Sequence, residues 1–357
     1  MMKHNFGAGP CILPQEVFKE AAEAVLNFDN TGLSILEVSH RSKEFVAVMD
    51  EAMDLVKKAL NVPQGYSVAF VQGGASLGFL ISAMNMMRDT KKAAYINTGT
   101  WSSKAIKECK NAGGTPIEIA SSEDKNFNYI PKNVNVPSDC DYFHFTSNNT
   151  IFGTQFKEFP KSSIPVVCDM SSDIFSREIN VADFDIIYAG AQKNLGPAGA
   201  TLFIVKDEIL GKSSVSIPTY LNLKTHVEKE SMFNTPPVYS VYVAMLNLRH
   251  LLATGGVPAM AKANQAKADL IYGEIDSNPM FEGTTAKEDR SNMNVTFVLT
   301  DETHKEEFDK MWNAAGIVGL KGHRSVGGYR ASMYNALPIS SVQVLVDVMK
   351  EFANKYA

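Results

Sequence analysis

The sequence predicts an α/β protein with a mostly parallel sheet, followed by a smaller α+β region. Between about residues 67 and 205, short apolar runs alternate with helical patterns, as in a parallel sheet covered by helices on both faces. With 357 residues, the chain exceeds the size at which a single hydrophobic core stops growing. We therefore expect a large domain over residues 16–255 and a small domain from residues 1–15 and 256–357.

The expected elements follow the apolar pattern. The strands of the sheet are predicted at 67–71, 93–97, 141–145, 164–169, 185–189 and 201–205, with helices at 77–87 and from a turn at Trp101 to about 112. Two further helices are expected at 240–253, ending at Gly255 and Gly256, and at 259–276. The small domain is predicted from a strand at 294–299, a helix at 305–315, a strand at 330–334 and a helix at 341–356.

The charge, the cysteines and the apolar runs of the sequence argue against several classes of function. A formal net charge of −5 argues against a broad nucleic-acid surface, which requires clustered Lys and Arg. The four cysteines are not spaced as zinc ligands or as a CxxC pair, so no metal site is expected. The N-terminus has no signal-peptide pattern, and no apolar run is long enough to cross a membrane. These features predict a cytoplasmic protein.

Lys193 is the first candidate for chemistry. It follows an apolar strand, within the small-residue stretch Ala189-Gly-Ala-Gln-Lys-Asn194. Poor hydration there lowers the pKa of an amine and frees it as a nucleophile, as a Schiff base with pyridoxal 5′-phosphate (PLP) requires. A lysine reaching from a strand end to water is the simpler interpretation of the residue alone.

Asp169 strengthens the case for Lys193. It ends another apolar strand, and the strand ends of a parallel sheet meet at one edge, where such folds bind ligands. A carboxylate there can keep the ring nitrogen of PLP protonated. The alternative role for Asp169 is to cap a helix.

A turn and an aromatic residue complete a possible cofactor site. Gly73-Gly74-Ala75-Ser76 joins a strand to a helix, and free N–H groups at a helix N-terminus bind phosphate. The turn matches neither the dinucleotide nor the P-loop motif, and any tight strand-to-helix turn has this composition. Trp101 either stacks on the cofactor ring or belongs to the core.

Basic residues in two further segments suggest a substrate with two anionic ends. They are His40, Arg41, His323, Arg324 and Arg330. Arginine binds carboxylate and phosphate through paired hydrogen bonds. The alternative is a set of solvated basic side chains.

At these residues the sequence resembles the phosphoserine aminotransferase family, within the class V aminotransferases of PLP fold type I. The resemblance covers nearly the whole chain. It is carried by Asn5-Phe6 with Gly9-Pro10, Glu37-Val-Ser-His-Arg41, Gln192-Lys-Asn194 with Gly-Pro after it, Ser231-Met-Phe-Asn-Thr-Pro-Pro237, and Gly322-His-Arg with Gly-Gly-Tyr-Arg-Ala331. The family fold implies a seven-stranded sheet in the large domain.

The resemblance also implies the site residues. Lys193 forms the Schiff base and carries the proton, Asp169 pairs with the ring nitrogen, Trp101 stacks on the ring, and Thr150 bonds its hydroxyl. The phosphate is held by Ala75, Ser76 and Gln192, with Asn234 and Thr235 of the partner subunit of a homodimer. Arg330 holds the α-carboxylate, and Arg41, His40, His323 and Arg324 hold the distal phosphate or carboxylate.

The implied reaction exchanges an amino group between L-glutamate and 3-phosphohydroxypyruvate, giving O-phospho-L-serine in serine biosynthesis. Activity on 4-phosphohydroxy-L-threonine, in vitamin B6 synthesis, is a further implication. The chain departs from some relatives at Ala8, in place of Ser, and at Ala75-Ser76, in place of Gly-Arg. The alternatives are a desulfurase or lyase of the same fold, a nucleotide-binding α/β protein, and a non-catalytic PLP carrier.

Overall fold

A seven-stranded sheet forms the centre of the larger part of the protein, as the computed structural model of residues 3–356 shows. The strand order is β2-β8-β7-β6-β5-β3-β4. The strands are β2 (Tyr66–Gly73), β3 (Lys92–Asn97), β4 (Thr115–Ser121), β5 (Tyr142–Thr146), β6 (Val166–Asp169), β7 (Ile186–Gly190) and β8 (Gly199–Lys206). Only β8 is antiparallel to its neighbours in this sheet. The predicted α/β fold class with a mostly parallel sheet is therefore confirmed.

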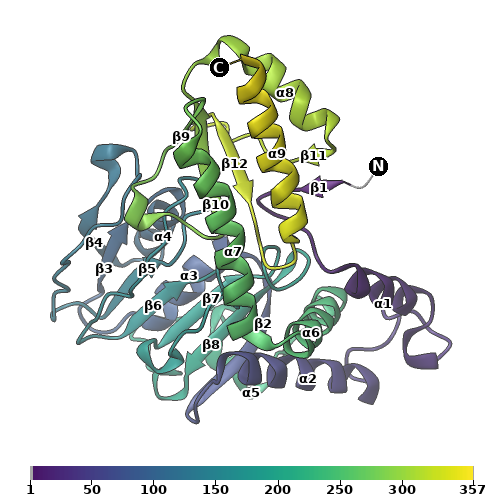
Figure 1. Ribbon diagram of the computed structural model, residues 1–357. Coiled ribbons are helices and arrows are strands. Elements are labelled where there is room, and N and C mark those ends of the chain that lie inside the picture. The colour runs from purple at the N-terminus through teal and green to yellow at the C-terminus, as the bar shows by residue number, and fades with distance from the viewer. Residues whose placement is uncertain (1–2, 357) are drawn as a thin grey trace.

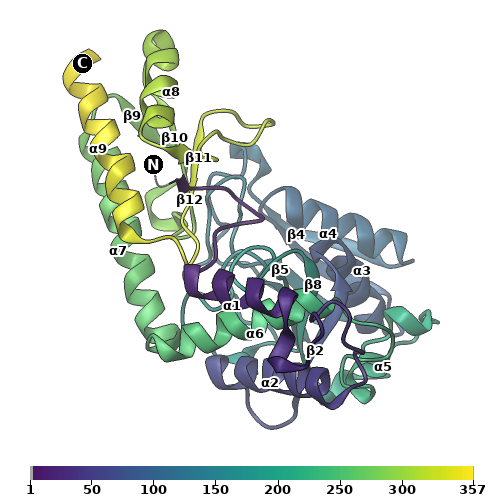
Figure 2. The same ribbon diagram turned by 90° about the vertical axis from the view of Figure 1, so that its right-hand side faces the viewer.

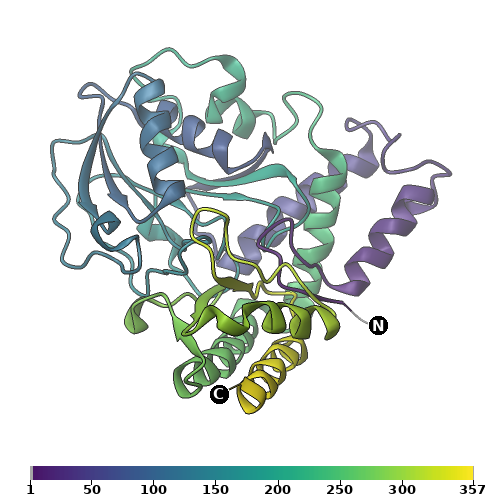
Figure 3. The same cartoon turned by 90° about the horizontal axis from the view of Figure 1, so that it is seen from above.

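Successive strand residues face two different apolar layers, because side chains alternate across a sheet. In β7, Tyr188 packs in one layer, whereas Ile187 and Ala189 pack in the other. Helices α3 (Ala75–Met86) and α4 (Thr100–Asn111) cover the Tyr188 face. The opposite face is covered by α1 (Gln15–Leu26), α2 (Lys43–Leu60) and α6 (Val238–Ala253), as Figure 3 shows from above. Helices therefore cover both faces of the sheet, and its edges are left for ligands.

The C-terminal part has a core of its own. Strands β9 (Phe281–Gly283), β10 (Asn294–Leu299) and β12 (Tyr329–Ser332) form an antiparallel sheet in the order β12-β10-β9. Helix α8 (Lys305–Ala314) packs near α9 (Ile339–Tyr356), and α7 (Gly256–Ser277) runs beside α9 (Figure 1). The remaining helix of the large part is α5 (Leu223–Glu228).

The N-terminal segment belongs to this smaller part in space. Strand β1 (His4–Asn5) pairs in parallel with β11 (Ile317–Val318), and Phe6 is fully buried in the smaller core. Figure 2 shows the segment running from this sheet to α1. The pairing supports the predicted division, whose boundaries stay a prediction; Met1, Met2 and Ala357 lie outside the described residues.

Several elements, among them β4, α1, α2 and α5, were not predicted from the apolar pattern, and two predicted details differ. Trp101 lies in the first turn of α4 and not in the turn before it, because Gly99, with φ of 143°, makes that turn alone. α7 begins at Gly256, so only Thr254 and Gly255 separate the two helices. Within residues 3–356, no helix combines the length and the apolar composition needed to cross a membrane.

The packing of α3 on the sheet gives a stability prediction. A Cβ added to Gly78 would lie 2.7 Å from a ring carbon of Tyr188, and that buried ring is held by a hydrogen bond to His144 of 2.8 Å. We expect Gly78→Ala to lower the free energy of unfolding by about 1–3 kcal/mol, measured by denaturant unfolding. Gly273→Ala in α7 is the control, since nothing lies within 4 Å of its Cβ position. Equal stability of the two variants would contradict the close contact.

Candidate active site

Three of the predicted site residues lie at one edge of the large sheet. Strands β5, β6 and β7 are parallel, so their carboxyl ends meet there. Thr150 follows β5, Asp169 ends β6, and Lys193 follows β7. The N-terminus of α3, directly after β2, lies at the same edge. The topology thus joins residues that are far apart in the sequence.

The amine of Lys193 is buried at this edge. The residue is only 7% exposed, and its Nζ donates a hydrogen bond of 2.6 Å to Thr150 Oγ1. Burial lowers the pKa of Lys193 to about 8, although the negative charge of Asp169 acts in the opposite direction. A substantial fraction of the amine is therefore neutral near pH 8 and can act as a nucleophile.

Asp169 is buried beside the lysine, with one carboxylate oxygen committed. Its Oδ1 accepts hydrogen bonds from the Ser171 backbone N–H at 2.9 Å and from Ser171 Oγ at 2.6 Å. Burial raises the pKa of Asp169, and the Ser171 bonds and the nearby Lys193 charge oppose that rise. Oδ2 bonds to nothing in residues 3–356, so it can accept a hydrogen bond from a cationic ring nitrogen.

Thr150 joins the lysine to a strand of the smaller part. Its hydroxyl accepts from Lys193, and its carbonyl accepts a hydrogen bond of 3.3 Å from Nη1 of Arg330 on β12. The Nε of Arg330 is buried and bonds to nothing in the described chain. An amine and a partly free guanidinium therefore both bond to one threonine, the amine to its hydroxyl and the guanidinium to its carbonyl.

The N-terminus of α3 has free N–H groups. Gly74 precedes the helix without a side-chain cap. A Cβ on Gly190 would lie 2.7 Å from Gln192 Oε1 and 3.3 Å from the Ala75 nitrogen, so only glycine leaves this space open. Ala75, Ser76 and Gln192 thus border a small cradle of the kind that binds phosphate.

Trp101 and a group of basic residues border the site. We call Lys104, His323, Arg324 and Arg330 the cation cluster. Lys193 Nζ lies 5.5 Å from the centre of the Trp101 ring, and Lys104 Nζ lies 4.7 Å from it. Burial and the positive charges of Arg330, Arg324 and Lys104 lower the pKa of His323. Lys104 was not predicted as a site residue from the sequence, although its position three residues after Trp101 on one helix places both on the same face.

Four predicted residues stay apart from this cluster within a single chain. His40 and Arg41 precede α2, and Asn234 and Thr235 lie between α5 and α6. Among residues 3–356, no hydrogen bond or ion pair joins their side chains to Lys193, Asp169 or the α3 N-terminus. The exposed side chains of Arg41 and Thr235 are available to a second molecule.

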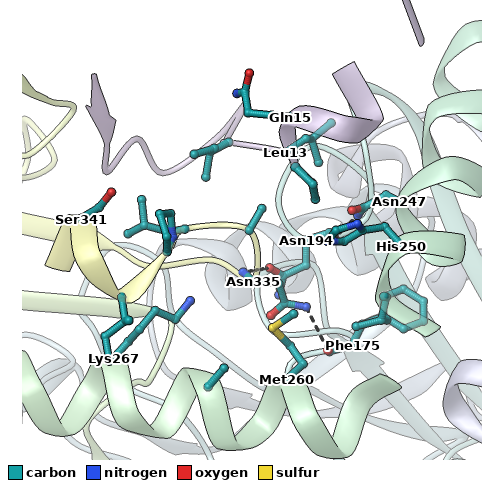
Figure 4. A pocket seen from close by; sticks show the side chains of 18 of the residues that line it. Leu13, Gln15, Phe175, Asn194, Asn247, His250, Met260, Lys267, Asn335 and Ser341 are labelled. Carbon is teal, nitrogen blue, oxygen red and sulfur yellow. Dashed lines mark hydrogen bonds between the residues drawn. The ribbon is translucent and has the colours of Figure 1, made fainter. Parts of the chain in front are cut away.

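A cavity of about 970 Å³ lies between the large and small parts (Figure 4). Its walls are mostly apolar and include Phe175, Leu251 and Met260. Of the predicted site residues, Lys193 alone lines it. We therefore distinguish this cavity from the site at the sheet edge, where Asp169, Thr150 and Arg330 lie.

The comparison with known proteins decides the family. The family model described as aminotransferase class-V matches residues 3–345. The chain belongs to the aminotransferase class-V family. Within it, the chain is 62% identical over 356 residues to the phosphoserine aminotransferase of Flavobacterium psychrophilum, covering 99% of this chain and 100% of that protein. The phosphoserine aminotransferase of Bacteroides fragilis is 55% identical, with 99% of each chain covered.

Solved structures of this aminotransferase family agree. The phosphoserine aminotransferase of Bacillus circulans subsp. alkalophilus has a TM-score of 0.96 and 42% identity, over 100% of this chain and 99% of that chain. A PLP-bound phosphoserine aminotransferase of Trichomonas vaginalis has a TM-score of 0.92 and 36% identity, over 98% of this chain and 100% of that chain. The fold and family that the sequence predicts are therefore both confirmed.

The buried amine gives a pH prediction. Only neutral Lys193 can attack the aldehyde of PLP, and its pKa is lowered to about 8 from an ordinary 10.5. We expect the rate of PLP attachment to cofactor-free protein to rise about tenfold per pH unit below pH 8 and then to level off. Stopped-flow absorbance measures this rate, with a free lysine amide as the control. A rate that still rises up to pH 10 would contradict the buried environment.

Proposed function

We propose that the chain is a PLP-dependent phosphoserine aminotransferase. It exchanges an amino group between L-glutamate and 3-phosphohydroxypyruvate, giving O-phospho-L-serine and 2-oxoglutarate. Full-length relatives with this name, at 55–62% identity, support the substrate. The structural observation that carries the proposal is the pairing of Lys193 and Arg330 on Thr150, because a transaminase must hold the nitrogen and the carboxylate of one amino acid together.

The residues present fit PLP. Asp169 Oδ2 is free for the ring nitrogen. Thr150 Oγ1 and Lys193 Nζ bond to each other, and PLP would replace this bond, with its ring hydroxyl at Thr150 and its aldehyde at Lys193. Ala75, Ser76 and Gln192 border the space for its phosphate, and Trp101 borders the space for its ring. When bound, PLP supplies an electron sink for the negative charge that develops at the substrate Cα.

The chain itself supplies binding and proton transfer. Arg330 binds the α-carboxylate through paired hydrogen bonds and so orients the Cα proton towards Lys193. Lys193 Nζ, partly neutral near pH 8, takes this proton and would return it to the carbon on the other side of the substrate nitrogen. A cationic ring nitrogen at Asp169 Oδ2 would favour the ionised carboxylate and so oppose the rise in its pKa that burial causes.

The distal end of the substrate meets the cation cluster. His323 and Arg324 lie on the loop before β12, near Arg330. We infer that His40 and Arg41 of the partner subunit join them, and that Asn234 and Thr235 of the partner subunit reach the cofactor phosphate. Each site is then completed only in a homodimer, which accounts for the separation of these four residues from the site within one chain.

A desulfurase of the same fold requires a reactive thiol, and the described chain offers none. Cys109, Cys140 and Cys168 are buried. Cys11 donates a hydrogen bond to the Lys193 carbonyl, and burial raises the pKa of its thiol to about 12. A reactive cysteine needs a lowered pKa instead. This observation favours transamination over desulfuration.

The overall proposal is tested by two half-reactions. We expect purified protein loaded with PLP to be yellow, and to convert to the pyridoxamine form with either L-glutamate or O-phospho-L-serine. Spectra recorded with each amino acid measure the conversion. Conversion with glutamate alone would leave an aminotransferase with a different second substrate, and no conversion with either would refute the proposal.

Lys193→Ala tests the role of the lysine. We expect it to abolish covalent attachment of PLP and nearly all turnover, by at least about 10³-fold, because no other amine is held beside Asp169 in the described chain. Lys91→Ala, on the surface at a turn before β3, is the control and should keep full activity. Turnover near the wild-type rate in Lys193→Ala would refute the assignment.

Arg330 and Arg324 should separate the two ends of the substrate. Arg330→Ala should lower kcat/KM about 10²-fold or more with both glutamate and phosphoserine, since both carry an α-carboxylate. Arg324→Ala should affect phosphoserine more than glutamate, because a phosphate dianion carries more charge than a carboxylate. Steady-state kinetics with each amino donor measure the two ratios. Equal losses for both donors in Arg324→Ala would contradict the division.

A further inference from the structure

Three separate chain segments meet next to the site through side-chain amides. The first is Lys193-Asn194 after β7, the second is the turn Ile174–Ser176 that follows Asp169, and the third is Asn335 beyond β12. These segments carry or adjoin Lys193, Asp169 and Arg330. Whatever holds them together sets the distances between the three groups that the proposed function requires.

Asn335 lies at the centre of this junction. Its backbone N–H donates to Asn194 Oδ1 at 3.0 Å, and its Nδ2 donates to the Phe175 carbonyl at 3.0 Å. Its Oδ1 accepts from Asn264 of α7 at 2.9 Å. Figure 4 shows Asn335 between Asn194 and Phe175. One side chain thus bonds to both parts of the protein.

Neighbouring amides extend the junction to the lysine loop. Asn194 Nδ2 donates to the Ile174 carbonyl at 3.1 Å, and Asn264 Nδ2 donates to the Ser176 carbonyl at 3.1 Å. Asn247 of α6 donates to the carbonyls of Asn194 and Leu195, both at 2.9 Å. The backbone next to Lys193 is therefore held by hydrogen bonds from two sides.

The apolar cavity lies beside this junction, so the position of the junction depends more strongly on its hydrogen bonds. Asn194, Asn247, Asn335 and Phe175 all line the cavity, so one side of the junction lacks close apolar packing. Where packing is absent, directed hydrogen bonds decide the position of the backbone. Asn194 and Asn264 are 4% and 1% exposed, so water does not replace their lost partners readily.

We propose that Asn335 is a positioning residue that fixes Lys193 and Asp169 relative to Arg330. Asn335 lies five positions beyond Arg330 on the same segment, and its side chain bonds the Phe175 carbonyl in the turn that follows Asp169. The same turn holds Asn194, next to Lys193, through the Ile174 carbonyl. The Asn335 side chain thus sets the separation between Arg330 and the other two groups by holding this turn. Asn335 itself does not touch the substrate. The catalytic consequence rests on the proposed function, whereas the mechanical one does not.

Asn335→Ala tests the mechanical part in full-length protein without PLP. The peptide 191–196 should exchange its amide hydrogens about tenfold faster by mass spectrometry. The reason is that the turn 174–176, which holds Asn194 through the Ile174 carbonyl, loses its bond from Asn335 Nδ2, although the Asn335 backbone N–H still donates to Asn194. Asn278→Ala is the matched control: its Nδ2 is buried and donates to Glu274 at 2.7 Å and Met349 at 3.3 Å, within the smaller part. It should lower Tm similarly and leave this peptide unchanged.

With PLP bound, the conversion rate with phosphoserine should fall about 10- to 100-fold in Asn335→Ala and less than twofold in Asn278→Ala. Asn335→Asp keeps the Oδ1 acceptor but sets a carboxylate oxygen against the Phe175 carbonyl, so it should also slow conversion. It serves as the test if the alanine variant does not fold. Equal exchange and equal rates in the Asn335 and Asn278 variants would overturn the proposal. If exchange changes in Asn335→Ala but the wild-type protein does not react with phosphoserine, the proposed function is refuted and the positioning role of Asn335 in the junction stands.

Discussion

The reactivity of the site depends on the burial of one amine. Lys193 is placed where water cannot solvate its charge, and the cost of that burial lowers its pKa to about 8. Neither Thr150, which accepts its hydrogen bond, nor Asp169, which carries a nearby charge, restores the ordinary value. The parallel sheet makes this arrangement possible, since the ends of β5, β6 and β7 bring the three residues to one edge.

The smaller part of the protein contributes a carboxylate-binding arginine and an asparagine that contacts the lysine loop, and the sheet edge has neither. Arg330 on β12 bonds the carbonyl of Thr150, and Asn335 beyond the same strand bonds Asn194 beside the lysine. Two contacts, one on each side of Lys193, therefore relate the carboxylate-binding position to the amine. In this arrangement a change in the position of the smaller part alters the geometry at Lys193 directly.

Strand-end residues were predictable from sequence because an apolar run followed by a polar residue marks the end of a buried strand. This reasoning placed Asp169 and Lys193 at the sheet edge, where the structure has them. It did not reach Asn335, since a loop asparagine carries no local pattern, and it passed over Lys104, whose only signal is its spacing of three residues from Trp101 on one helix. The order of β8 and β2 in the sheet, and the pairing of β1 with β11, depend on contacts between distant segments and had no local signal. The family resemblance supplied the positions that one chain keeps apart, such as Arg41 and Asn234, and their roles stay predictions.

The most direct measurement is the position of the covalent bond to the cofactor. Protein loaded with PLP would be reduced with borohydride, digested and mapped by mass spectrometry. We expect one pyridoxyl group, on Lys193, and loss of that label in Lys193→Ala. A label on another lysine, or none in protein that binds PLP tightly, would contradict this assignment.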